Sequence, residues 1–135
     1  MRQAVGGALF NNGKLLVVKR VASEIMRPND WEIPGGKNEE GESDGEALRR
    51  EFIEETQIKV NVKERYHTFH YDYKGEPAEE NDYFVASDSY DVKIGPQEHS
   101  EFRWVTKDEA RALKMSAEMK KSVMKAFAIV QSASL

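Results

Sequence analysis

The chain has 135 residues, of which 39% are hydrophobic and 33% are charged, and its net charge is −4 at neutral pH. This length predicts one domain, residues 1–135, large enough to bury a hydrophobic core. The negative charge argues against binding to long nucleic acid, whose affinity depends on basic surfaces. The sequence has no cysteine, which excludes disulfide bonds and thiolate metal sites.

The sequence shows no sign of membrane insertion or export. Its apolar runs fall short of the roughly 18 residues of a membrane-spanning helix. The N-terminus, MRQAVGGALF, lacks the pattern of a secretory signal. We therefore expect a cytoplasmic protein with no membrane partner. The sequence does not indicate an oligomeric state.

The first half of the chain alternates strand patterns with turn signals. Strands are predicted over 3–10 and 15–19, joined by a turn at Asn11-Asn12-Gly13. A loop over 21–30 and a short extended segment over 31–34 follow. A helix is predicted over 43–56, because Ser43 and Glu46 have the spacing of a capping box.

The second half contains more strand patterns and ends in helices. The predicted elements are one or two strands over 59–73, a polar turn over 74–81, a strand over 82–87 and a strand over 102–105. Thr106 and Glu109 form a second capping box for a short helix, and a final helix starts at Ser116. Strands that surround a helix and end in further helices predict an α/β fold, with a mixed sheet covered on both faces.

Three carboxylates, Glu51, Glu54 and Glu55, lie three and four residues apart in the predicted helix. They fall on one face, within roughly 100° of arc. Like charges at these spacings repel, and a hard divalent cation such as Mg²⁺ would offset the repulsion. The cluster therefore indicates a metal site for phosphate chemistry. The alternative is a solvated acidic face that binds nothing.

Residues 36–58 resemble the Nudix box, a pattern of Gly, five residues, Glu, seven residues and then Arg-Glu-hydrophobic-any-Glu-Glu-any-Gly-hydrophobic. The matching positions are Gly36, Glu42, Arg50, Glu51, Phe52, Glu54, Glu55 and Ile58. The departure is Gln57, where the pattern has Gly. That Gly would end the helix in a left-handed conformation, which Gln can adopt at a modest cost.

The resemblance implies a Nudix-type α/β/α sandwich and hydrolysis of a phosphoanhydride bond. By this resemblance Glu51, Glu54 and Glu55 bind one to three Mg²⁺ or Mn²⁺ ions, with help from the backbone carbonyl of Gly35 or Gly36. Glu51 is the first candidate for the general base. Glu98, six residues before Trp104, is the second candidate and a further metal ligand.

Other residues near the box are expected to contact the substrate or to position the acids. Arg50 should brace the carboxylates as a bidentate donor. Arg20 and Lys37 are candidate phosphate contacts, and glycines let the backbone approach the substrate closely. The full set of candidate substrate contacts is Arg20, Glu32, Gly35, Gly36 and Lys37.

The predicted substrate is a small nucleotide in which a nucleoside diphosphate is linked to another group. A nucleoside triphosphate is favoured by the short chain, and ADP-ribose or another nucleotide sugar is the alternative. Nudix proteins that read oxidised guanine often have Asn near the start of the last helix. This chain has Ser116-Ala117-Glu118 there, which disfavours oxidised guanine nucleotides as substrates. A noncatalytic Nudix-fold nucleotide sensor is a further alternative, although such proteins usually lose carboxylates of the box.

Several residues outside the box have more ordinary expected roles. His67 and His70 would point to opposite faces of a strand, so a joint metal site is not expected. The sequence predicts three groups of such residues: surface or edge histidines (His67, His70, His99), core residues (Phe102, Trp104, Met119) and a solvated acidic turn (Glu79, Glu80, Asp82). Trp31 is expected either to stack on a nucleobase or to pack in the core or at its rim, and the second role is favoured.

Overall fold

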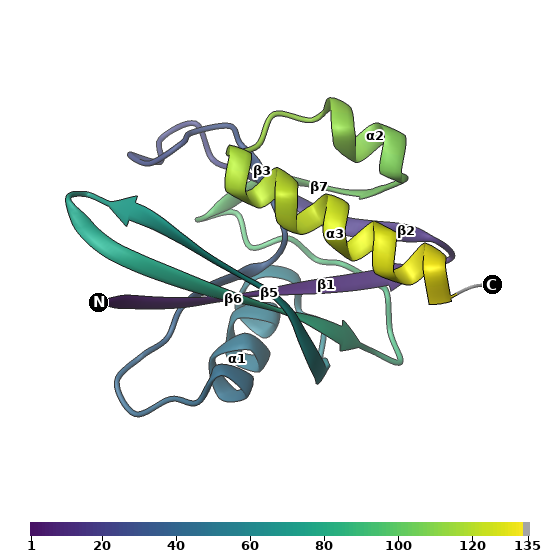
Figure 1. Cartoon of the computed structure of the whole chain (residues 1–135), viewed down its shortest axis with the longest axis horizontal. Coiled ribbons are helices and arrows are strands. Elements are labelled where there is room, and N and C mark those ends of the chain that lie inside the picture. The colour runs from purple at the N-terminus through teal and green to yellow at the C-terminus, as the bar shows by residue number, and fades with distance from the viewer. Residues whose placement is uncertain (134–135) are drawn as a thin grey trace.

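The chain folds around a seven-stranded mixed sheet (Figure 1). The computed structural model describes residues 1–133, so the last two residues of the predicted domain lie outside the described range. The main strand order is β3-β2-β1-β6-β5, with β4 paired to β1 and β7 paired to β2. The β1–β6 pairing is parallel and the other pairings are antiparallel, as expected for a mixed sheet.

The elements agree with the predicted order, with longer strands. The strands are β1 (Arg2–Asn11), β2 (Lys14–Arg20), β3 (Trp31–Glu32), β4 (Gly35–Lys37), β5 (Asn61–Tyr73), β6 (Glu76–Ala86) and β7 (His99–Val105). The helices are α1 (Asp44–Thr56), α2 (Lys107–Ala112) and α3 (Ala117–Ala133).

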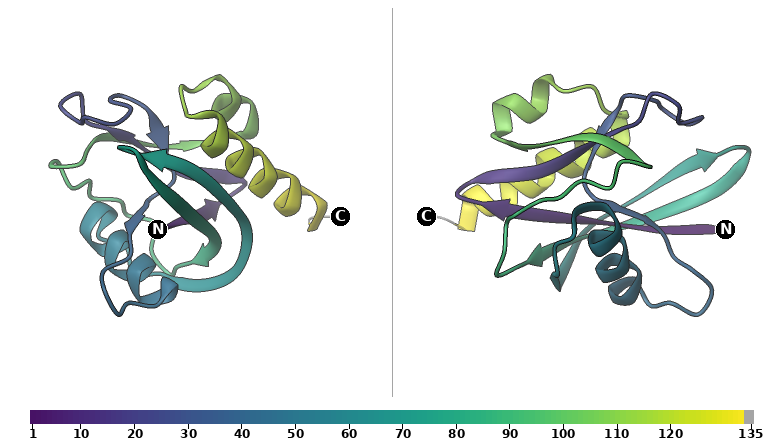
Figure 2. Two further views of the ribbon diagram at one scale, coloured as in Figure 1. Left: turned by 60° about the vertical axis from the view of Figure 1, so that its left-hand side comes forward. Right: turned by 180° about the vertical axis from the view of Figure 1, so that it is seen from behind.

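Helices α1 and α3 lie on opposite faces of the sheet, and each covers its own hydrophobic core (Figure 2). The core under α3 includes Phe127 and Phe69, whereas the core under α1 includes Phe52 and Leu9. The alternation of side chains along the strands supplies both cores. This arrangement is the predicted α/β/α sandwich.

Both predicted capping boxes are present. The Ser43 hydroxyl accepts a hydrogen bond from the Glu46 amide at the start of α1, and the Glu46 side chain accepts one from the Ser43 amide. Thr106 and Glu109 make the same pair of bonds at the start of α2. These bonds satisfy amides that lack partners within the helix, so local sequence determines where α1 and α2 begin.

The predicted polar turn over 74–81 is wrong, because the turn occupies only Lys74 and Gly75. Both residues have positive φ, 52° and 84°, which suits the tight turn of a β-hairpin. Strand β6 therefore starts at Glu76 and pairs with β5 along its length. The hairpin extends well beyond the helices in Figure 1.

The prediction that Glu79, Glu80 and Asp82 form a solvated turn is also wrong. All three belong to β6, where alternate side chains face opposite sides of the sheet. Asp82 is completely buried, and Oε2 of Glu80 is buried as well. Acidic residues are depleted in strands, so their local sequence favours a loop, and the pairing with β1 and β5 overrides that preference.

Strand β4 was not predicted, because its sequence is Gly35-Gly36-Lys37 and has no strand pattern. It pairs with β1, where Gly35 lies opposite Gly6. A Cβ on Gly35 would lie only 2.0 Å from the carbonyl oxygen of Val5. The glycine is therefore required for this close approach of two backbones.

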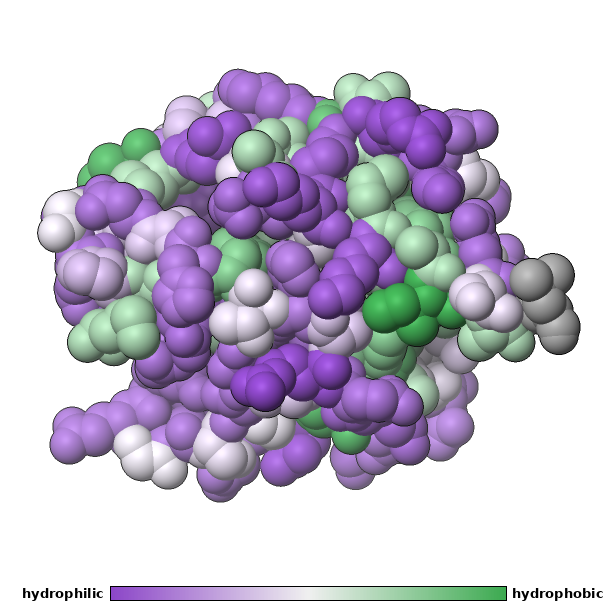
Figure 3. Space-filling model, viewed as in Figure 1, coloured by the Kyte–Doolittle hydropathy of each residue, from purple (hydrophilic) through white to green (hydrophobic). Residues whose placement is uncertain are grey.

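The expected core residues differ in their burial. Met119 is buried as predicted, and partly buried Trp104 packs against the core under α1. Phe102 is 36% exposed, so its prediction as a core residue is wrong. Trp31 is 5% exposed. The face seen in Figure 1 is mostly hydrophilic, with small separate hydrophobic patches (Figure 3).

Within residues 1–133, no helix combines the length and apolar character that crossing a membrane would require.

Gln57, the departure from the box, caps α1 in the left-handed conformation, with φ 58° and ψ 23°. Glycine adopts this conformation without strain, whereas Gln does so at a cost. We expect Gln57→Gly to stabilise the protein by up to about 1 kcal/mol, measured by urea unfolding. Gln131→Gly, an exposed change within α3, is the control and should give no gain. A less stable Gln57→Gly variant would contradict the role of backbone strain.

Candidate active site

The carboxylates of Glu51 and Glu55 lie against the glycine strand β4. A Cβ on Gly36 would lie 2.7 Å from the carboxyl carbon of Glu51. The Gly35 amide donates a hydrogen bond of 3.3 Å to Oε1 of Glu55. The two glycines thus leave room for carboxylates beside the backbone. Both glutamates are buried, with side-chain exposures of 10% and 2%.

Arg50 connects the acids of α1 with the loop before the helix. It donates hydrogen bonds of 2.7 and 2.8 Å to Glu42 and one of 2.9 Å to Glu51. It also bonds to Glu54 at 3.3 Å and to the carbonyl oxygen of Lys37 at 3.0 Å. The hydrogen bond from Arg50 lowers the pKa of Glu42 to about 2. This is the bracing arrangement predicted for Arg50.

Glu54 does not share the buried environment of the other two acids. Its side chain is 53% exposed and its described partner is Arg50. The structure therefore places Glu51 and Glu55 inside the site and Glu54 at its rim. The predicted common face of the helix holds, but its three carboxylates differ in exposure.

His99 is the site residue that the sequence analysis missed, and its prediction as a surface or edge histidine is wrong. It is 2% exposed and lies at the start of β7, opposite Arg20 at an irregularity in the β2–β7 pairing. Its Nε2 lies 2.8 Å from Oε2 of Glu32, and its Nδ1 lies 3.6 Å from Oε1 of Glu55. The one sequence feature that could have indicated His99 is the neighbouring candidate Glu98. Nothing in the sequence pattern around His99 indicates that its side chain is buried.

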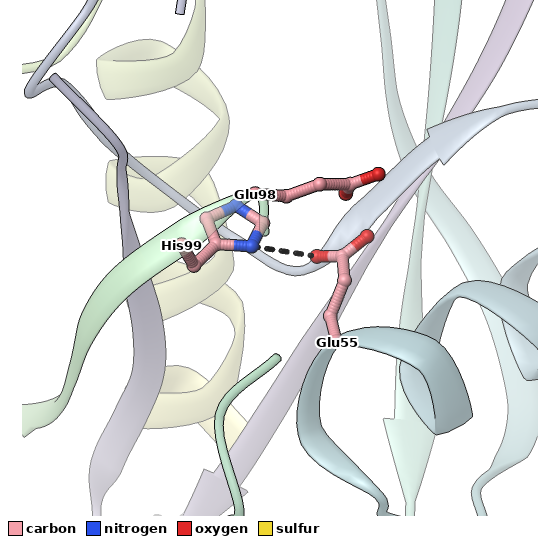
Figure 4. A group of neighbouring side chains, drawn as sticks. All are labelled: Glu55, Glu98 and His99. Carbon is pink, nitrogen blue, oxygen red and sulfur yellow. Dashed lines mark ion pairs between the residues drawn. The ribbon is translucent and has the colours of Figure 1, made fainter. Parts of the chain in front are cut away.

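Glu55, Glu98 and His99 come together from α1 and from the start of β7 (Figure 4). One ligand atom from each of the three lies within 4.8 Å of the others. Burial raises the pKa of Glu55, and the nearby acids Glu51, Glu32 and Glu98 raise it further. Burial and Glu51 also raise the pKa of Glu98.

The unpaired atoms of this cluster fit a divalent cation. Oε2 of Glu55 and Nδ1 of His99 are buried without a hydrogen-bond partner among the described residues. Buried polar atoms normally have a partner, and such exceptions often mark an ion site. Carboxylate oxygens are ligands that Mg²⁺ and Mn²⁺ accept. The donor set is therefore suitable for the metal that the sequence predicts.

The candidate substrate contacts surround the acids, but Arg20 is already engaged. Its guanidinium bonds to Glu32 at 3.3 Å and to the carbonyl oxygen of Met26 at 3.0 Å, and it lies 3.5 Å from Glu24. Glu32 in turn bonds to His99. Lys37 is exposed. Its ammonium group has no described contact and is the freer of the two predicted phosphate contacts.

A cleft of about 620 Å³ joins these residues into one site. Its lining includes the acids Glu51 and Glu98 and the aromatic residues Trp31, Phe69 and Tyr71. Acidic side chains suit a metal that carries phosphate, and aromatic side chains suit a flat apolar group such as a nucleobase.

The NUDIX domain family matches residues 1–127, so the chain belongs to the Nudix family and the resemblance is confirmed. It is 31% identical to an uncharacterised Nudix hydrolase of Listeria monocytogenes, over 82% of this chain and 66% of that protein. It is 37% identical to an RNA pyrophosphohydrolase of Bartonella henselae, over 56% of this chain and 47% of that protein. The aligned regions thus span about half to two thirds of these relatives.

Among solved structures, the fold is similar to that of a MutT protein from Methanosarcina mazei Go1. The TM-score is 0.85 at 22% identity, with 96% of this chain and 94% of that chain covered. This likeness confirms the sandwich fold.

The raised pKa of buried Glu55 predicts how stability depends on pH in the metal-free protein. Folded Glu55 keeps its proton above the ordinary carboxyl pKa, so the stability present at low pH is lost as pH rises through the raised value. Glu55→Gln removes this loss. We expect its melting temperature in EDTA to match that of the wild type near pH 5 and to exceed it by about 5 °C near pH 8.

The control for this measurement is Glu54→Gln, which changes an exposed acid on the same helix. Its difference from the wild type should vary little with pH. A difference for Glu55→Gln that is equal at pH 5 and pH 8 would contradict the buried, protonated state of Glu55.

Proposed function

We propose that residues 1–135 form a single Nudix domain that hydrolyses a phosphoanhydride bond in a small nucleotide, using Mg²⁺ or Mn²⁺. The observation that carries this proposal is the single cleft that is lined both by acids of the cluster and by aromatic side chains. Hydrolysis of a phosphoanhydride needs charge neutralisation and an aligned water, and a cation held by these acids would supply both. The cytoplasm remains the expected location.

The proposed metal ligands are Glu51, Glu55, the backbone carbonyl of Gly35, and Glu54 from the rim. Glu98, the further ligand expected from the sequence, is instead assigned to proton transfer. A cation held there would supply neutralisation of the substrate phosphates and acidification of a water. The chain's own groups orient these ligands. Arg50 holds Glu51, and the Gly35 amide and His99 lie on either side of the same oxygen of Glu55.

The surroundings of Glu51 and Glu98 suit different roles in proton transfer. Glu51 is anchored by Arg50 and lies against Gly36, which favours a ligand role. Glu98 is exposed, its carboxylate has no described hydrogen bond, and its pKa is raised. A base works best when its pKa approaches the working pH. Glu98 is therefore the preferred base, although the sequence ranked Glu51 first.

A nucleoside triphosphate is the proposed substrate, and cleavage would release a nucleoside monophosphate and pyrophosphate. A partly aligned relative from Enterobacter is described as a nucleoside triphosphatase, which supports this class. ADP-ribose and other nucleotide sugars are the alternative. The Bartonella relative is described as an RNA pyrophosphohydrolase. The net charge of −4 makes long RNA the less favoured substrate here.

The test is a panel of nucleoside triphosphates, ADP-ribose and a 5′-triphosphorylated RNA, incubated with Mg²⁺ and analysed for released products. Release of monophosphate and pyrophosphate from triphosphates supports the proposal. Metal-independent stabilisation by nucleotide, without turnover of any substrate, would instead identify a sensor. A protein that neither hydrolyses nor binds any member would exclude both functions.

Glu55→Gln should lower hydrolysis by two or more orders of magnitude at saturating Mg²⁺, because an inner ligand is lost while the fold persists. The measurement is the turnover number for the best substrate of the panel. Glu40→Gln is the matched control, since Glu40 is exposed and has no described contact with the site. Near-wild-type turnover of Glu55→Gln would refute the assignment of Glu55 as a ligand.

Glu51→Gln and Glu98→Gln should differ in how they respond to metal. Loss of the base lowers kcat with little change in metal affinity, whereas loss of a ligand weakens metal binding. We expect Glu98→Gln to show the first pattern and Glu51→Gln the second, in kinetics measured over a range of Mg²⁺ concentrations. Full recovery of both variants at high Mg²⁺ would show that neither is the base.

A further inference from the structure

Two acids on β6, Glu80 and Asp82, meet outside the metal cluster, and Glu80 lines the cleft. They are two residues apart, so their side chains share one face of the strand. A Cβ on Gly6 would lie 2.5 Å from Oδ1 of Asp82 and 2.8 Å from Oε2 of Glu80. The two oxygens therefore converge above the backbone of Gly6, which has no side chain to separate them.

These two oxygens have an unusual environment. Oε2 of Glu80 and Oδ1 of Asp82 are both buried, and neither accepts a hydrogen bond from a described donor. Two ionised carboxylates in contact repel strongly, and one proton between them removes the repulsion. A shared proton accounts for both unpartnered oxygens, because one acid then donates to the other.

The neighbours indicate which acid holds the proton. Asp82 accepts a hydrogen bond of 2.5 Å from Ser122, whose hydroxyl also bonds to that of Tyr66 at 2.8 Å. His67 also favours the charged form of Asp82, although burial raises the pKa of this acid. Glu80 has no such donor, and burial and Asp82 raise its pKa well above the ordinary value.

Two more charged groups face Glu80. Glu32 raises the pKa of Glu80 and Arg2 lowers it. This environment favours the neutral form of Glu80, whose hydroxyl would then donate to ionised Asp82.

Glu80 also lines the cleft. Its partner across the strands is Phe69, whose ring lies 5.7 Å from that of Tyr71. Phe69, Tyr71 and Trp31 line the same cleft. A nucleobase that packs against these aromatic side chains therefore binds in the cleft that Glu80 lines.

We propose that Glu80, held in place by Asp82, selects nucleotides whose base carries an exocyclic amino group. Because its hydroxyl is engaged with Asp82, the oxygen that remains for a ligand is an acceptor. An amino group of adenine, cytosine or guanine donates to it, whereas hypoxanthine and uracil have no exocyclic amino group and carry only ring N–H donors. The inference rests on the proposed binding of nucleotides in this cleft and adds the class of base.

A purely structural role for the pair is the competing explanation. Burying two acids is costly, and a structural pair would be expected to have its oxygens satisfied by donors of the protein. A structural pair would also leave the choice of base unaffected. The choice of base is therefore the property to measure.

The experiment compares kcat/KM for three matched pairs of substrates: GTP with ITP, CTP with UTP, and ATP with purine riboside triphosphate. For the wild type we expect a preference of about tenfold or more for the amino-bearing member of at least one pair, as for a hydrogen bond to a buried group. A preference below about threefold in all three pairs overturns the proposal.

Variants of Glu80 separate the chemical roles. In Glu80→Gln the amide donates to Asp82 in place of the hydroxyl and its carbonyl still accepts, so the preference should persist. Glu80→Leu should abolish the preference, because the side chain no longer offers an acceptor. Glu79→Leu, on the opposite face of the same strand, is the control and should keep the preference. Loss of the preference in Glu80→Gln, or its persistence in Glu80→Leu, overturns the proposal.

The proposal can still be tested if Glu80→Leu does not fold or if no triphosphate is hydrolysed. If Glu80→Leu does not fold, the wild-type preference and the Glu80→Gln variant decide the matter. If no triphosphate is hydrolysed, the proposed activity fails by itself, and binding of GMP against IMP and of CMP against UMP is measured by calorimetry. Tenfold tighter binding of an amino-bearing monophosphate supports the inference, and equal or undetectable binding overturns it.

Discussion

The site depends on the contact between two carboxylates of α1 and a strand that has almost no side chains. Glu51 and Glu55 can lie beside β4 because a Cβ on Gly36 would occupy the position of the Glu51 carboxyl group. Strand β4 is itself held to β1 by a backbone approach that Gly35 permits. The glycines therefore allow α1 and its acids to lie close to the sheet, where Glu51 lines the cleft.

Buried negative charge is the main energetic problem of this arrangement, and the chain meets it in two ways. Arg50 compensates the outer acids, since it bonds to Glu42, Glu51 and Glu54. Glu55 lies beyond its reach, and burial instead raises the pKa of this acid. The inner part of the site therefore suits a proton or a cation, and exchange between the two would make metal binding depend on pH.

A second group of buried acids lies on a different element, β6. Glu80 and Asp82 meet above Gly6, as Glu51 meets Gly36. In both places a glycine provides the space and the sheet provides the burial. The two groups of acids differ in how their negative charge is compensated. Arg50 pairs with the outer acids of α1, whereas Asp82 accepts from the uncharged hydroxyl of Ser122.

Local sequence determined the elements whose cause is local. The capping boxes at Ser43 and Thr106, the acidic face of α1 and the bracing by Arg50 could all be predicted, because they depend on residues within one or two helical turns or on the Nudix box. Tertiary structure alone decided the rest. Strand β4, the burial of His99 and the pairing of Glu80 with Asp82 depend on contacts between strands distant in sequence, and those contacts override the local preference of glycine and acidic residues for loops.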